Sequence, residues 1–368
     1  MARPQILSIP ERLDAHPDFR GRGVCVGFVD AGFYAHPDLM RPARRIRAFV
    51  DVTREQPADS EFFTAHPRAW HGTMAACSAA GNGWSSGGRY RGLACEAEVV
   101  LIKACSDGGE ITGKNVAAAI RFPLKHPELG IQVLNVSLGV DADDPHAQDV
   151  ELAVREVVAA GVTVFAAAGN SPGQMPEPPA TATEAITVGG GNDGNTSAGD
   201  DDRPWPSSHG SPRPGVSKPD LLAPAIWLPA PVLPGTLVAR EGAALFQLLS
   251  VLEELTAEQA YLAGSGRLDA SQCEAAMEFL GAVEGRLERG KHISADHQHV
   301  DGTSFASPIA ASVAAQMLEA DPSLTPALIR EGLLATAVKL KGVAPAVQGA
   351  GLLGARGAVE WARRRSSR

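Results

Sequence analysis

The sequence has little of what a membrane-spanning, exported or nucleic-acid-binding protein needs. Its longest apolar-rich segment, near residues 243–255, is too short to cross a bilayer and contains Glu253 and Glu254. The first residues contain no apolar run of the kind found in a secretory signal. The formal net charge is −9, and no basic cluster forms the positive face that nucleic acid requires. We therefore expect neither a membrane nor a nucleic acid as a partner.

Cysteine is also scarce. The 368 residues include five cysteines, an odd number without paired CxxC spacing. Because disulfides persist mainly in oxidising compartments, reduced thiols in the cytoplasm are the simplest interpretation. The chain is 44% hydrophobic and 20% charged, so it has enough apolar material for a sizeable core. These totals predict a cytoplasmic protein with one large domain.

Continuous apolar runs alternate with helical patterns along the chain. Four runs have the composition of strands buried on both faces: residues 24–29, 98–105, 133–139 and 162–170. Apolar residues at helical spacing predict helices over residues 115–126 and 149–160. This alternation predicts an α/β fold with a parallel, doubly wound sheet. In such sheets, ligands bind at the carboxyl ends of the strands.

Three reactive side chains stand at the ends of predicted elements. Asp30 follows the first strand, and His71 opens a short alanine-rich helix that Gly81 terminates. Ser304 lies in the run GTSFASP at residues 302–308, where a helix N-terminus favours developing negative charge. Taken singly, each residue has a plainer interpretation: a turn aspartate, a surface histidine and a serine helix cap.

Four separated motifs together resemble the subtilisin-like serine peptidases, or subtilases, in the family order aspartate, histidine, serine. The motifs are DAG at 30–32, HGT at 71–73, AAGN at 167–170 and GTS at 302–304. The resemblance covers residues 5–235 and 300–360. Residues 82–83 and 90–94 look most like the intracellular bacterial branch of the family.

The resemblance implies both a fold and an activity. The family has a three-layer α/β fold, in which a central, mostly parallel sheet is flanked by helices. We expect this fold in a single peptidase domain over residues 1–368, with a helical insertion at residues 237–299. The implied activity is that of a serine endopeptidase, which hydrolyses peptide bonds through an acyl-enzyme intermediate.

The resemblance also assigns roles to individual residues. Asp30 would orient His71 and stabilise its charged form, and His71 would act as general base on Ser304. Asn170 would donate a hydrogen bond to the oxyanion of the tetrahedral intermediate. Two segments would contact the peptide or protein substrate, one by strand pairing and one as a wall of the primary specificity pocket: Ser137, Leu138 and Gly139, and Ala167, Ala168 and Gly169.

Several residues depart from the family pattern. Ala31 stands where a serine or threonine is usual, Met74 where a second histidine is common, and Asp301 where a small polar residue precedes the glycine. A carboxylate at position 301 would raise the pKa of His71 if it pointed inward. Residues 9–24 already match the start of the mature catalytic domain, so we expect folding without an inhibitory prodomain.

The insertion has the pattern of a helical hairpin. Two apolar stripes at helical spacing define it: Leu245, Leu248, Leu249, Leu252 and Leu255, then Ala276, Phe279, Leu280, Val283 and Leu287. Thr256, with Gln259 three residues later, predicts the start of a further short helix. The plainer interpretation is a pair of helices packed on the domain surface. The alternative is a lid, or a docking site for a partner, that controls access to the cleft.

The predicted chemistry requires no cofactor, and we assign no metal ligand. Structural calcium is common in the family, but the acidic runs at residues 141–144 and 200–202 are more typical of solvated loops than of a calcium motif. His292, His297 and His299 lack the spacing of a tetrahedral metal site.

The main functional prediction is therefore a serine endopeptidase. One alternative is a dedicated processing protease or transpeptidase for a particular peptide or partner protein. The other is a pseudoprotease that binds peptides without catalysing their hydrolysis.

Overall fold

The computed structural model describes residues 5–54, 59–197, 199, 201–264 and 271–366. Its centre is a twisted sheet in the order β10-β6-β5-β4-β1-β3-β2, in which all of these neighbours are parallel and β7 pairs antiparallel with β6. The strands are β1 (Cys25–Asp30), β2 (Ile46–Asp51), β3 (Glu98–Lys103), β4 (Ile131–Val136), β5 (Thr163–Ala167), β6 (Ile186–Asn192), β7 (Arg203–Pro204) and β10 (Leu221–Pro224). The predicted parallel sheet is confirmed.

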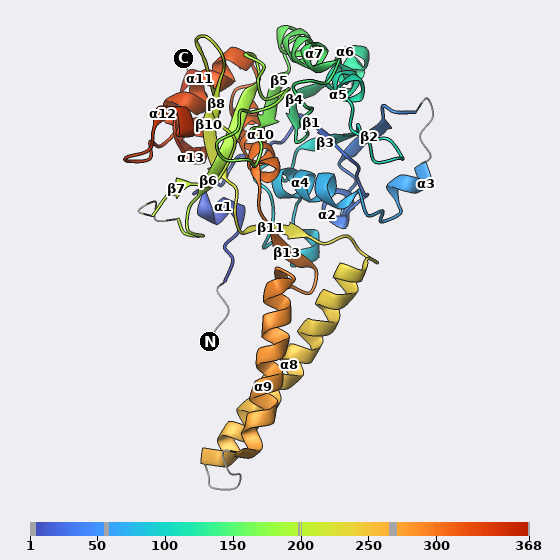
Figure 1. The fold of residues 1–368 in the computed structure, drawn as a ribbon, viewed down its shortest axis with the longest axis vertical. Coiled ribbons are helices and arrows are strands. Elements are labelled where there is room, and N and C mark those ends of the chain that lie inside the picture. The colour runs from blue at the N-terminus through green and yellow to red at the C-terminus, as the bar shows by residue number, and fades with distance from the viewer. Residues whose placement is uncertain (1–4, 55–58, 198, 200, 265–270, 367–368) are drawn as a thin grey trace.

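Helices cover both faces of this sheet and make three layers (Figure 1). One face carries α4 (Trp70–Ala80), α10 (Thr303–Ala320) and α13 (Ala355–Ser366). The other carries α5 (Gly113–Ile120) and α7 (Ala147–Ala159). The alanine-rich sequence of α10 keeps this helix thin, so it is buried across the centre of the sheet. The predicted three-layer α/β fold is confirmed.

Shorter elements connect these layers. Outside the insertion, the described chain also contains α1 (Ile9–Arg12), α2 (Pro37–Met40), α3 (Asp59–Phe62), α6 (Phe122–Lys125), α11 (Pro326–Thr336) and α12 (Pro345–Gln348), with 3₁₀ turns at Trp84–Ser86 and Pro127–Leu129. A two-stranded ribbon consists of β8 (Gly210–Arg213) and β9 (Val216–Lys218). A small sheet has the order β11-β13-β12, from Leu228–Pro231, His297–Val300 and His292–Ser294.

The insertion projects from this small sheet as two long antiparallel helices (Figure 1). They are α8 (Leu237–Gly264) and α9 (Ser271–Arg289). Four buried side chains form the seam between them: Leu249, Leu252, Val283 and Leu287. The last residues of the insertion form β12 and β13, which lead the chain back to the start of α10.

Two details of the hairpin differ from the sequence-based expectation. Thr256 does not begin a new helix, because its hydroxyl donates to the carbonyl of Leu252 (2.8 Å), as threonines inside helices do. Leu255 and Phe279 are 42% and 51% exposed, although both belong to the predicted stripes. Two helices bury only the residues along their seam, so the edges of each stripe stay in solvent.

The long helices of the insertion are not membrane spans. Among the described residues, no helix combines the length and the apolar composition that crossing a bilayer requires.

Candidate active site

Asp30 and His71 meet at the carboxyl edge of the central sheet. Asp30 is the last residue of β1, and His71 is the second residue of α4. The Nδ1 atom of His71 lies 2.8 Å from Oδ1 and 2.9 Å from Oδ2 of Asp30. The Asp30 side chain is 2% exposed, whereas that of His71 is 24% exposed. The carboxylate is therefore shielded from water while the imidazole remains accessible.

Gly72 allows this close approach of α4 to β1. A Cβ atom at position 72 would lie 2.4 Å from the carbonyl oxygen of Gly32 and 2.7 Å from the Cβ atom of Asp30. Real Cβ contacts are not this short, so any larger residue would push the helix away from the strand. The glycine after the histidine thus sets the distance between the two interacting side chains.

Asp30 controls both the tautomer and the charge of His71. A carboxylate can only accept from the Nδ1–H group, so the neutral imidazole keeps its lone pair on Nε2. Burial lowers the pKa of His71, but the charge of Asp30 and its hydrogen bond together raise it above the ordinary 6.5. This is the environment of a base that can take up a proton and hold it.

Ser304 is the second residue of α10, and the residue that follows it packs against His71. The ring of the next residue, Phe305, is 5.4 Å from the His71 ring, measured between centroids. Gly302 precedes the helix with φ at 133°, a backbone conformation that favours glycine. The serine is half-buried, whereas the residues on either side of it in this helix are buried.

A chain of buried hydrogen bonds fixes the backbone around Ser304. Pro308 has no N–H group, so the Ser304 carbonyl lacks its usual helical donor. The hydroxyl of Ser137 donates to that carbonyl instead (2.9 Å). Asn135 donates to Ser137 (2.9 Å) and accepts from Ser307 (2.7 Å). The sequence alone assigns no role to Asn135 or Ser307, because a polar residue within a buried strand or helix gives no indication of its distant partner.

Asn170 is held with its amide nitrogen free to donate. Its Oδ1 atom accepts from the backbone N–H and from the hydroxyl of Thr303, both at 2.9 Å. Because only oxygen can accept the backbone N–H, these bonds determine which way the amide points. The Nδ2 atom then faces Gly302, where a Cβ atom would lie 3.4 Å from it. The absent side chain leaves space for a ligand oxygen beside Nδ2.

The two predicted substrate-binding segments lie side by side. Residues 137–139 follow β4, and residues 167–169 begin at the end of the neighbouring parallel strand β5. The chain then turns away after Asn170 and returns to the first segment, where the Val140 N–H donates to the Pro178 carbonyl (2.9 Å). Residues 171–178 therefore form a loop that connects the end of the second segment to the end of the first.

Asp301 has partners other than His71. It accepts from the backbone N–H of Trp227 (2.9 Å), pairs with Lys291, and lies 3.7 Å from His299. Burial raises the pKa of Asp301, but these hydrogen bonds and the Lys291 charge lower it well below its ordinary value. Asp301 is therefore not among the groups that raise the pKa of His71.

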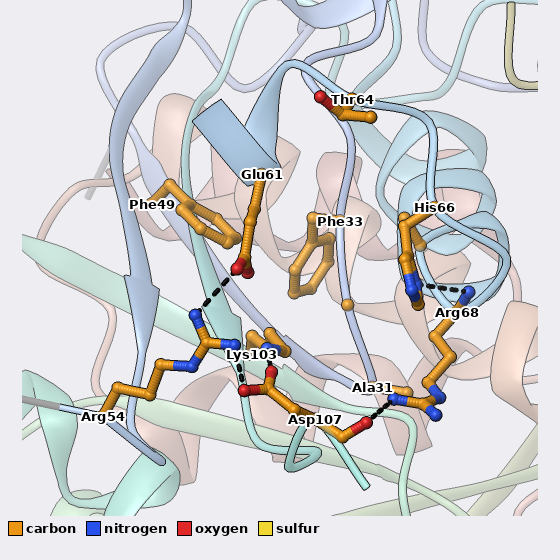
Figure 2. A pocket seen from close by; sticks show the side chains of 12 residues that line it. Ala31, Phe33, Phe49, Arg54, Glu61, Thr64, His66, Arg68, Lys103 and Asp107 are labelled. Atoms are coloured by element: carbon orange, nitrogen blue, oxygen red, sulfur yellow. Dashed lines mark hydrogen bonds and ion pairs between the residues drawn. The ribbon is translucent and has the colours of Figure 1, made fainter. Parts of the chain in front are cut away.

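A charged pocket is lined in part by Ala31, the residue that follows Asp30 (Figure 2). Ala31 and Gly32 line one side of it, and Ala69, two residues before His71, lines another. Arg54 pairs with Glu61 (2.7 Å) and with Asp107, and Lys103 lies 3.3 Å from Asp107 (Figure 2). The charged side chains of this pocket therefore form ion pairs mainly with one another.

The same cluster is the place where the described residues best approach a metal site. Carboxylate oxygens of Asp51, Glu61 and Asp107 lie within 4.8 Å of one another. Lys103 already binds Asp51 (2.6 Å), and Arg54 binds the other two carboxylates. A cation would have to displace both basic side chains, so these residues do not fit a calcium site.

Several of the other acidic and histidine groups have structural partners of their own. Asp144 accepts from the backbone N–H groups of Gly113 (3.0 Å) and His146 (2.7 Å), as a loop aspartate does. Asp200 lies outside the described residues. His297 contacts Asp296 and His299 contacts Asp301, so within the described ranges the three histidines do not converge on one point.

Comparison with known proteins identifies the family. The chain is 30% identical to serine protease AprX of Bacillus subtilis over 351 residues, covering 92% of this chain and 66% of that protein. It is 24% identical to mycosin-1 of Mycobacterium tuberculosis, covering 95% of this chain and 71% of that protein. The structure of the prenylagaramide maturation protease PagA is similar in fold, with a TM-score of 0.59, 18% identity, and coverage of 92% and 93% of the two chains.

The chain spans 66% of the length of AprX, about two thirds, so these matches concern the domain that the two proteins share. The model of the subtilase family matches residues 21–352, which contain every element described above from β1 to α12. The chain therefore belongs to the subtilase family.

Proposed function

We propose that this protein is a serine endopeptidase that cleaves peptide bonds through an acyl-enzyme on Ser304. The observation that carries the proposal is the hydrogen bond that His71 Nδ1 donates to the buried carboxylate of Asp30, at 2.8 Å, with the His71 ring packed against Phe305 at the start of α10. A neutral serine hydroxyl is a weak nucleophile and needs a base that is held in the correct tautomer. The family match supports the same chemistry.

Each step of the proposed reaction uses a side chain of this site. The Nε2 atom of His71 removes the hydroxyl proton of Ser304 as its Oγ attacks the substrate carbonyl. Asn170 Nδ2 and the Ser304 backbone N–H donate to the oxyanion that forms. The imidazolium then gives its proton to the leaving amine, and a water molecule hydrolyses the ester by the reverse sequence. No metal or cofactor takes part in these steps.

An extended substrate would bind along residues 137–139, by adding a strand beside them. Backbone hydrogen bonds supply affinity with little dependence on sequence. The small side chains of Ala167, Ala168 and Gly169 would form one wall of the pocket for the residue before the cleaved bond.

A second candidate is a processing protease with a particular partner. The observation that favours it is the hairpin of α8 and α9, which projects away from the catalytic domain (Figure 1). Val251, Leu255 and Tyr261 of α8 are 61%, 42% and 73% exposed, and Glu254 and Glu258 lie between them on the helix. PagA, a maturation protease by its title, has a similar fold.

We infer that the outer face of α8 docks a basic amphipathic segment of a protein partner or substrate. Between residues 241 and 285, the sequence contains seven glutamates and one aspartate but a single basic residue, Arg267. A second copy of the same acidic face would be repelled, whereas a basic and apolar segment complements both its charge and its apolar side chains.

We also propose a cytoplasmic location. Four cysteines are free and buried in the part of the chain that the structure describes: Cys25, Cys77, Cys95 and Cys105. Free thiols are typical of reducing compartments. Subcellular fractionation with an antibody to the protein tests this, and recovery of the active protein only from the culture medium would contradict it.

A fluorophosphonate probe tests the proposed catalytic function. We expect covalent labelling of the wild type, and peptide mapping should locate the adduct on Ser304. Ser304→Ala should abolish labelling, and His71→Ala should slow it by orders of magnitude. A folded wild-type protein that binds peptides but resists the probe would instead be a non-catalytic binding module.

A further inference from the structure

One loop connects the ends of the two segments that we propose bind the substrate. Residues 171–178 begin beside the oxyanion residue Asn170 and end at Pro178, whose carbonyl accepts from Val140. Most of this loop is uncharged: the sequence from 171 to 178 is SPGQMPEP, and Glu177 is its single ionisable residue. The charge of this loop therefore depends on one side chain.

Glu177 lies directly against Gly139. A Cβ atom at position 139 would be 3.4 Å from Oε2 and 3.8 Å from Cβ of Glu177. Glycine keeps the space beside the carboxylate open, and Glu177 itself is exposed to solvent. A substrate side chain that entered between residues 137–139 and 167–169 would reach this carboxylate.

The carboxylate has no cationic partner among the described residues. Neither Glu177 nor its acidic neighbour Asp141 forms an ion pair in that part of the chain, whereas Asp51, Glu61 and Asp301 each pair with a lysine or arginine. Partial burial and then the negative charge of Asp141 raise the pKa of Glu177. Both effects would be relieved by a cation placed beside the two carboxylates.

We propose that Glu177 is a specificity-determining residue, which selects substrates with lysine or arginine immediately before the cleaved bond. This inference rests on the proposed endopeptidase function. The methylene stem of a long basic side chain would pack against Leu138 and Ala167, because lysine and arginine lay their stems on apolar surfaces. Their charged ends would then bind Glu177, with Asp141 adding to the attraction. Acidic side chains would be repelled at the same position.

The test compares peptide substrates that differ only in the residue before the cleaved bond. We expect kcat/KM for lysine and arginine to exceed that for leucine by at least about tenfold in the wild type. Glu177→Gln keeps the shape of the side chain and should lower kcat/KM for the basic peptides by about 10- to 100-fold. It should leave the leucine peptide nearly unchanged. Glu331→Gln, at an exposed position on α11, is the matched control and should change neither.

Charge reversal gives an independent result. Glu177→Lys should turn the preference toward glutamate or aspartate before the cleaved bond. Fluorophosphonate labelling of every variant shows whether the catalytic machinery remains intact. A labelled wild type that cleaves without basic preference, or a Glu177→Gln variant that retains it, would overturn this inference alone. A wild type without labelling or cleavage would overturn the catalytic proposal, and this inference with it.

Discussion

The hydroxyl group of Ser137 donates a hydrogen bond to the backbone carbonyl oxygen of Ser304 at 2.9 Å. The bond joins the segment that follows β4 to the first turn of α10, across 167 positions of sequence. It occupies the acceptor that Pro308 leaves without a helical donor. The segment proposed to bind the substrate thereby also holds the proposed nucleophile.

Removing Asn135 should impair catalysis by loosening this connection. Asn135→Ala leaves the hydroxyls of Ser137 and Ser307 without their buried partner, at a cost of about 1–3 kcal/mol of stability. We expect kcat to fall by about tenfold or more, because small displacements of a nucleophile are costly, while KM changes little. Steady-state kinetics and thermal unfolding measure the two effects.

Ser312→Ala is the matched control for that variant. Ser312 is also buried in α10, but its hydroxyl donates only to the carbonyl of Ile309 in the same helix (2.6 Å). Its removal should leave kcat within about twofold of the wild type, since surrounding contacts are retained. Equal losses of kcat in both variants would show that Asn135 has no special positioning role.

Gly72→Ala should disrupt the contact between Asp30 and His71. The added methyl group would overlap the Gly32 carbonyl and the Asp30 side chain, which we expect to destabilise the fold by about 1–3 kcal/mol and to reduce kcat. Gly281→Ala in α9 meets no atom within 4 Å and should stabilise its helix by about 0.5–1 kcal/mol. Chemical denaturation and peptide hydrolysis report both outcomes; normal activity in Gly72→Ala would contradict the proposed role of this close approach.

The activity should be lost in acid at a pH above the ordinary value for histidine. His71 acts as a base only when neutral, and Asp30 raises its pKa above 6.5 in spite of burial. As the pH falls through this raised value, kcat/KM should fall with it. Asp30→Asn removes the stabilising charge, so the acid limb should move to lower pH and kcat should drop by about 10⁴-fold. A pH profile of kcat/KM whose acid limb does not move in this variant would contradict the electrostatic coupling.

The hairpin should bind basic amphipathic helices. A fluorescent 18-residue peptide of leucine and lysine should bind the wild type in anisotropy titrations, and added salt should weaken binding. Its leucine and glutamate counterpart should not bind. Combined Glu254→Gln and Glu258→Gln substitutions should weaken the interaction, whereas Glu331→Gln should not. Equal binding of both peptides would contradict the proposal that the acidic face of α8 docks basic segments.

Much of the fold could be predicted from the sequence because its elements carry local signals. The run before Asp30 is continuously apolar, which identifies a buried strand that ends at the aspartate. The helix α4 begins with the histidine motif and ends at Gly81, so the motif and the glycine identify its two ends. The order of the four motifs then indicated the family. These signals are local, so they can be recognised without knowing which distant residues are in contact.

Other features depend on partners that the sequence does not reveal. The pair Asn135 and Ser307 joins positions 172 residues apart, within elements that otherwise look entirely apolar. The predicted helix over residues 115–126 divides at Arg121, because Pro123 cannot continue the hydrogen bonding of α5. Thr256 has a capping pattern but lies inside α8, where packing along the seam outweighs the local signal.

The central claim is that Ser304 forms a covalent acyl-enzyme with the substrate. Rapid acid quenching of the wild type with a peptide ester, followed by mass spectrometry, measures this intermediate directly. We predict an acyl adduct on the peptide that contains Ser304, with none in Ser304→Ala and slower formation in Asn170→Ala. Hydrolysis that proceeds at the wild-type rate in Ser304→Ala, or without any adduct at this position, would contradict the account.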